Sequence, residues 1–68
     1  MIRISLKAAR VNAELSQHEA SAKLGVSNKT LCAWERGEVM PRADKIKEIC
    51  ELYNMPYDNI IFLPKGSF

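Results

Sequence analysis

Two predicted helices joined by a very short turn constrain this chain more than any other feature of its sequence. In SQHE, the Ser16 hydroxyl can accept from the backbone N–H of Glu19 while the Glu19 carboxylate reaches back, the reciprocal pattern of a capping box. The helix over residues 17–24 ends at Gly25, because glycine adopts the left-handed backbone conformation without a Cβ clash. Ser27 is again a good N-cap, so a new helix begins at once. Two helices joined this tightly must cross at a steep angle.

Helical periodicity also appears on both sides of this pair. A first helix is predicted from about Leu6 to Ala13, after Ser5 as a possible N-cap, and the helix that follows Ser27 extends to about Arg36. Further positions indicate a fourth helix and a short fifth turn or helix: Ile46, Ile49, Cys50 and Tyr53, then Asp58, Ile60 and Ile61. We therefore expect an all-α fold of five short helices.

The length and the two ends of the chain add little to this picture. Sixty-eight residues allow one domain at most, so residues 1–68 are expected to form a single domain. The apolar run IIFL at residues 60–63 could extend as a strand in an oligomer, and residues 64–68 are expected to be a frayed end. A formal net charge of +2 is compatible with nucleic acid as a partner but does not require it.

Residue types needed for other chemistries are scarce. Cys32, Cys50 and His18 show none of the paired spacings of a zinc site, so we expect no metal and reduced thiols. No nucleophile, base and orienting group come together, so we expect neither an enzyme nor a cofactor. No apolar run has bilayer length, and charges stand where a signal peptide needs an apolar block. The sequence predicts a cytoplasmic protein without a membrane segment.

Residues 17–36 combine a glycine turn with small or apolar residues that would bury one face of each helix against the other. These seam positions are Ala20, Ser21, Leu24, Val26, Leu31 and Trp34. The pattern is that of a helix-turn-helix in the DNA-binding sense. Further segments that match in register are Arg10, WERG, Pro41, IKEICELYNM and DNII. With these matches, nearly the whole chain resembles the phage repressor and Cro type of domain, the Xre family. The resemblance implies a lambda-repressor-like fold in which residues 28–36 enter the major groove.

Polar residues begin the helix that would lie in the groove. An exposed polar turn is the plain interpretation of Asn28, Lys29 and Thr30. Within the helix-turn-helix we favour base reading, in which asparagine pairs with adenine, lysine with guanine, and the threonine methyl contacts thymine. Ala33 is included as a fourth base-reading candidate.

Candidate phosphate contacts lie at the two ends of the helix-turn-helix and beyond it. They are Gln17, Ser27, Arg36, Arg42, Lys45 and Lys7. The family resemblance also implies an ion pair between Arg10 and Glu35, near the DNA backbone.

Four positions depart from the family or resist assignment. Ser21 occupies the tight position between the two helices and is small enough to fit there. Arg42 replaces a frequent serine cap before the fourth helix and supplies a charge instead. Cys50 is expected to be a small core residue, whereas Cys32 should project on the DNA-facing side, where we interpret it as a spectator.

The sequence therefore favours a sequence-specific regulator of transcription that binds a double-stranded DNA operator. Among regulators, it favours a repressor. A homodimer on two half-sites is the expected working form, and residues 60–63 with Phe68 are the suspected dimer contact. The alternative is an antitoxin or adaptor of the same fold that acts mainly through a protein partner. The low net charge and the acidic residues Glu48 and Glu51 keep this alternative open.

Overall fold

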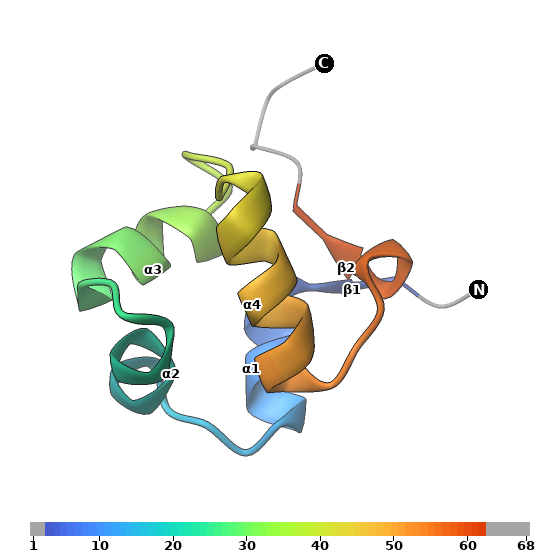
Figure 1. The fold of residues 1–68 in the computed structure, drawn as a ribbon, viewed down its shortest axis with the longest axis horizontal. Helices are drawn as coiled ribbons and strands as arrows, with labels where there is room; N and C mark the ends of the chain where they lie inside the picture. The colour runs from blue at the N-terminus through green and yellow to red at the C-terminus, as the bar shows by residue number, and fades with distance from the viewer. Residues whose placement is uncertain (1–2, 63–68) are drawn as a thin grey trace.

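A computed structural model describes residues 3–62, which form a small helical bundle closed by two short strands (Figure 1). In chain order the elements are β1 (Ile4–Ser5), α1 (Leu6–Asn12), α2 (Gln17–Leu24), α3 (Asn28–Glu35), α4 (Ala43–Tyr53), the 3₁₀ helix η1 (Tyr57–Asn59) and β2 (Ile60–Ile61). The predicted all-α class is confirmed, with four α-helices and one 3₁₀ helix in place of five short helices. The expected frayed tail at residues 64–68 lies outside the described residues.

Serine caps start three of the helices. The hydroxyls of Ser5, Ser16 and Ser27 each accept from the backbone N–H three residues ahead, at 3.0–3.1 Å. The Glu19 carboxylate closes the capping box by accepting from the Ser16 N–H at 2.9 Å, and this hydrogen bond lowers the pKa of Glu19. Gly25 ends α2 in the left-handed conformation with φ of +71°. The predicted limits of α2 and the predicted start of α3 at Asn28 are confirmed, and α3 ends at Glu35, one residue before the predicted Arg36.

The two strands correct the expectation for residues 60–63. Ile60 and Ile61 pair in parallel with Ile4 and Ser5 of the same chain, so no oligomer is needed to extend them. Figure 1 shows β1 and β2 side by side beside the start of α1. The pairing buries Ile60 and Phe62, at 1% and 5% exposure, inside the fold. Of the suspected dimer contact only Ile61 is exposed, and Leu63 and Phe68 lie outside the described residues.

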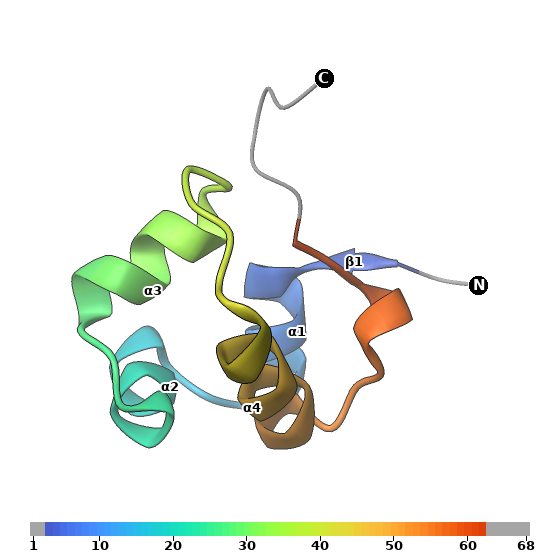
Figure 2. The same cartoon turned by 45° about the horizontal axis from the view of Figure 1, so that its top comes forward.

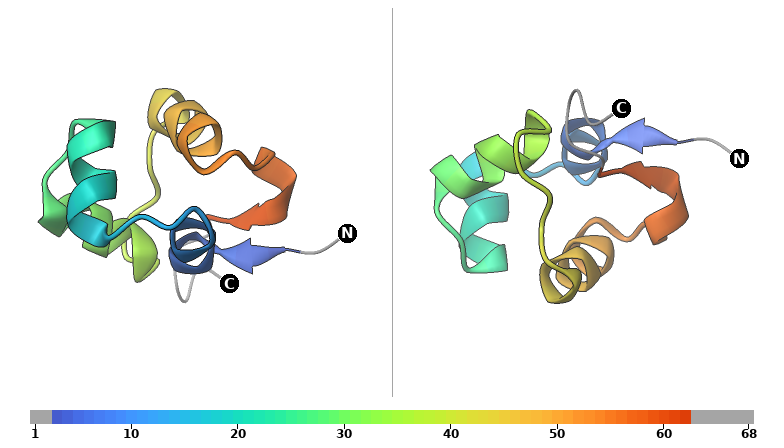
Figure 3. Two further views of the ribbon diagram at one scale, coloured as in Figure 1. Left: turned by 90° about the horizontal axis from the view of Figure 1, so that it is seen from below. Right: turned by 90° about the horizontal axis from the view of Figure 1, so that it is seen from above.

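A single cluster of buried apolar side chains holds these elements together. It consists of Leu6, Ala9, Ala20, Leu24, Leu31, Trp34, Ile49, Tyr53, Ile60 and Phe62. Figures 2 and 3 show α2 and α3 at one end of the molecule, the strands and η1 at the other, and α1 and α4 between them. At the seam, the buried Ser21 hydroxyl donates to the His18 carbonyl at 3.0 Å. Serine therefore fits this position without leaving its hydroxyl unpaired.

Arg42 stands at the N-cap of α4 with extended backbone but makes no side-chain cap hydrogen bond. We expect Arg42→Ser to raise the free energy of unfolding by about 0.5–2 kcal/mol, because serine can accept from a free N–H of the first turn. Removal of the exposed Arg42–Asp44 pair, at 3.6 Å, offsets little of this gain. Urea unfolding followed by circular dichroism measures the change. Arg42→Ala removes the same charge without adding a cap, and equal stability of the two variants would contradict the expectation.

The Tyr53 hydroxyl is buried and has no hydrogen-bond partner among residues 3–62. Burial, with a further contribution from the Glu35 charge, raises the pKa of Tyr53 to about 12. The unfolded chain releases this proton near pH 10, whereas the folded protein keeps it. The contribution of Tyr53 to stability should therefore be constant below about pH 10 and fall by up to about 2 kcal/mol between about pH 10 and pH 12.

Tyr53→Phe should abolish this alkaline loss and leave stability near neutral pH unchanged or about 1 kcal/mol higher, because an unpaired buried hydroxyl is removed. Urea unfolding at about pH 8 and about pH 11 gives the loss for each protein. Tyr57→Phe is the matched control, since Tyr57 is 52% exposed. The same alkaline loss in wild type and Tyr53→Phe would show that other groups cause it.

Candidate nucleic-acid interface

The third helix turns its apolar side inward and its polar first turn outward. Leu31 and Trp34 are buried at 0% and 8% exposure, which places the tryptophan in the core. Asn28 and Lys29 are exposed, and Thr30 and Ala33 are half-buried. Ala33 lies one helical turn after Lys29 and therefore on the same side of α3. Three of the four base-reading candidates thus lie in the first turn of α3, and the fourth lies directly behind them.

Two of the candidate residues are bonded to each other at the start of α3. The Ser27 hydroxyl accepts from the Thr30 N–H at 3.1 Å and donates to the Thr30 hydroxyl oxygen at 3.0 Å. This leaves the Thr30 methyl group and its own hydroxyl proton for other contacts. Ser27 acts first as a cap, and a phosphate contact from its hydroxyl would replace one of these bonds.

A buried ion pair fastens the end of α3 to α1. The Arg10 guanidinium donates from Nε to Glu35 Oε2 at 2.7 Å, and the two side chains are 9% and 4% exposed. A second nitrogen lies 3.4 Å from Glu35 Oε1, and Nη1 donates to the Leu15 carbonyl at 2.9 Å. The hydrogen bond to Glu35 raises the pKa of Arg10. Arg10 therefore stays charged, and the pair holds α3 in a fixed place against α1.

The Gln17 side chain connects this ion pair to the outer surface of α3. Its Nε2 donates to Glu35 Oε1 at 3.0 Å. Its Oε1 lies 3.1 Å from Cys32 Sγ and 3.4 Å from Asn28 Nδ2. Gln17 is half-buried at the first position of α2. One amide thus links α2, the first two turns of α3 and the buried carboxylate.

Two exposed arginines lie beyond the C-terminal end of α3. The Arg36 and Arg42 side chains are 68% and 85% exposed. Their carboxylate neighbours Glu38 and Asp44 lie at 3.8 and 3.6 Å, and such exposed pairs contribute little free energy. Both guanidinium groups can therefore turn to a phosphate at small cost.

The other two candidate cations differ from each other. The Lys45 ammonium donates to the Leu24 carbonyl at 2.7 Å and to Glu48 at 3.3 Å. It satisfies a carbonyl at the end of α2, and its contact with phosphate stays a prediction. Lys7 is exposed in the first turn of α1, and its contact with phosphate stays a prediction.

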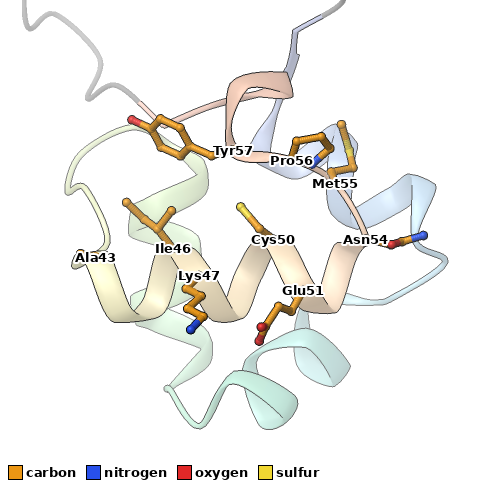
Figure 4. A pocket seen from close by; sticks show the side chains of 9 residues that line it. All are labelled: Ala43, Ile46, Lys47, Cys50, Glu51, Asn54, Met55, Pro56 and Tyr57. Atoms are coloured by element: carbon orange, nitrogen blue, oxygen red, sulfur yellow. The ribbon is translucent and has the colours of Figure 1, made fainter.

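An apolar groove lies between α4 and the chain that follows it (Figure 4). Its volume is about 490 Å³, and half-buried Ile46, Cys50 and Met55 contribute to its lining. Cys50 thus packs at the edge of the core rather than in its centre, and burial raises the pKa of its thiol. Figure 3 shows α2 and α3 on the other side of α4. The groove is therefore separate from the first turn of α3.

Within residues 3–62, no three histidine, cysteine or acidic side chains are grouped so that they could hold a metal ion. No helix in this part of the chain has the length and apolar character to cross a membrane.

Two contacts of the candidate residues escaped sequence reasoning. The i, i+4 spacing of Asn28 and Cys32 places both on one side of α3, but their common contact with Gln17 depends on how α2 and α3 cross. Lys45 reaches α2 only through the packing of α4 against it. No local signal in the sequence indicates either contact.

A family model described as Helix-turn-helix matches residues 6–60, most of the chain. Neither a curated protein nor a solved structure matches it.

Proposed function

This chain belongs to the Cro/C1-type helix-turn-helix family, whose members are DNA-binding regulators, and we propose that it recognises a specific sequence in double-stranded DNA. The observation that best supports this proposal is the contrast between the two sides of α3. Its inner side is fixed by Leu31, Trp34 and the buried Glu35, while Asn28 and Lys29 are exposed. A rigid helix with exposed amide and ammonium groups in its first turn suits hydrogen bonding to base edges in the major groove.

Base reading is assigned to the first turn and one position behind it. Asn28 would pair with adenine, Lys29 with guanine, and the methyl groups of Thr30 and Ala33 would contact thymine. Phosphate contacts are assigned to Gln17 before α3 and to Arg36 and Arg42 after it, with Ser27 and Lys7 as further candidates. Contacts at both ends of α3 would fix its register on the duplex.

Regulation is proposed to be repression by occupancy of the operator. One copy of α3 reads only a few base pairs, so useful affinity needs a homodimer on two half-sites roughly 34 Å apart. The exposed side chains of Tyr57 and Ile61 offer apolar area outside the DNA-binding surface for such a contact.

A binding selection from random duplex oligonucleotides tests the proposal. We expect one short motif to be enriched and its affinity to fall steeply between low and physiological salt, because each phosphate contact releases counterions. No enriched sequence, together with no detectable DNA binding at low salt, would overturn the proposal.

The groove beside α4 favours a second candidate, an antitoxin or adaptor that acts through a protein partner. A substitution in the lining of the groove, Lys47→Glu, distinguishes the two functions. If a partner in this groove carries the function, the variant should lose activity on a reporter gene in cells while keeping operator binding in vitro. A DNA-binding regulator should keep both.

A further inference from the structure

We propose that Cys32 is a positioning residue for DNA binding: its thiol holds the Gln17 amide so that Asn28 is free to bind a base. The inference rests on the proposed function and extends it to a residue that the sequence left as a spectator. The relevant contacts are those of the Gln17 side-chain amide, whose nitrogen donates hydrogen bonds and whose oxygen accepts them.

The Glu35 carboxylate decides which way the Gln17 amide faces. An ionised carboxylate only accepts hydrogen bonds, so the Gln17 group 3.0 Å from Glu35 Oε1 must be the nitrogen Nε2. Glu35 itself is fixed by Arg10 at 2.7 Å. The Gln17 oxygen must therefore face α3, where it needs a donor.

Two donors on α3 face that oxygen, and the thiol is the nearer. Cys32 Sγ lies 3.1 Å from Gln17 Oε1, whereas Asn28 Nδ2 lies 3.4 Å away, beyond the usual range for an N–H···O bond. Cys32 is half-buried beneath the surface and Asn28 is exposed. The thiol thus satisfies Gln17 from below, and the Asn28 amide can move to a base edge without leaving the Gln17 oxygen unpaired.

The held amide also presents a donor. One hydrogen on Gln17 Nε2 points to Glu35, and the second remains available in the plane that Cys32 and Glu35 fix together. A phosphate could accept this hydrogen without a further loss of side-chain freedom. Without the thiol, the Gln17 oxygen would turn to Asn28 and compete with the base for the same amide.

The test compares Cys32→Ser, which keeps a donor, with Cys32→Ala, which removes it. On the selected operator, Cys32→Ala should bind about 3- to 10-fold more weakly, the usual size of one lost hydrogen bond, and Cys32→Ser should stay within about 2-fold of wild type. Cys32→Ala should also discriminate less well against a changed base pair at the position that Asn28 reads. Cys50→Ala, which removes the thiol in the groove beside α4, is the matched control and should change neither property.

A double-mutant cycle separates positioning from a general effect on folding. In a Gln17→Ala background, Cys32→Ala should have little further effect on affinity, since the amide that the thiol holds is gone. Wild-type affinity and discrimination in Cys32→Ala, or an undiminished loss in the Gln17→Ala background, would overturn the proposal.

Nuclear magnetic resonance of the free protein tests the positioning role of Cys32 without DNA. Failure of this role can therefore be told apart from failure of the proposed function. The Gln17 side-chain amide protons should be sharp and separated in wild type and Cys32→Ser, and averaged in Cys32→Ala. If these signals are alike in all three proteins, the positioning role is wrong whatever the DNA experiments give. If they differ as expected and no DNA sequence is bound, the proposed function is the part that fails.

Discussion

Glu35→Ala should lower the free energy of unfolding by about 3–5 kcal/mol, the largest effect we expect from a single substitution near the interface. The substitution leaves the Arg10 guanidinium, only 9% exposed, without its charged partner. It also removes the acceptor for Gln17. A loss of this size is comparable with the whole stability of so small a domain, so the variant should be largely unfolded without denaturant. Urea unfolding followed by circular dichroism gives the measurement.

Two further variants identify the cause of this loss. Glu35→Gln keeps an acceptor of similar shape and should lose less. The pair Arg10→Met with Glu35→Leu removes both charges and should recover most of the stability, because no uncompensated charge stays buried. A loss of less than about 1 kcal/mol in Glu35→Ala would mean that Arg10 reaches solvent and that the pair behaves like an exposed one.

The helices were predictable because their signals are local. Each serine cap bonds to a residue three positions ahead, and Gly25 ends α2 through its own backbone conformation. Neither signal depends on distant packing. The buried stripe of α4 is likewise fixed by helical spacing, with Ile49 and Tyr53 buried one turn apart.

The strands were not predictable in the same way. Ile60 pairs with Ile4, at the opposite end of the chain, and a strand of two residues is too short to show an alternating pattern. Its apolar side chains therefore suggested an oligomer contact, whereas Ile60 and Phe62 complete the core of the same molecule. Only the folded chain brings the two ends together.

Part of the candidate site follows from local sequence signals, and part depends on how the helices pack. Asn28 and Lys29 follow directly from their place after the Ser27 cap, because the first turn of a helix in this motif is its free end. The roles of Cys32 and Lys45 depend on helix crossing, which sets the contacts with Gln17 and with the Leu24 carbonyl. The hydrogen bond from Lys45 to the end of α2 therefore follows from the fold and not from the local sequence.

Lys29→Ala should weaken binding to the selected operator by about 1–3 kcal/mol and relax preference at one or two base pairs, because it removes a donor to a guanine edge. Arg42→Ala should instead weaken binding to all sequences about equally and reduce the salt slope by about one, as expected for one lost phosphate contact. Affinities for the operator and for single-base variants, each measured over a range of salt, separate the two effects.

The Lys29 and Arg42 variants can be compared directly, because both side chains carry one positive charge and neither is buried. Lys29 is exposed in the first turn of α3, and the Arg42 side chain is 85% exposed before α4. Neither alanine variant should change folding appreciably, so their difference reports position relative to DNA and not the loss of charge itself. Uniform weakening across all sequences for Lys29→Ala would move this residue from base reading to the phosphate backbone. Altered preference in Arg42→Ala would place the start of α4, and not only the first turn of α3, within reach of the bases.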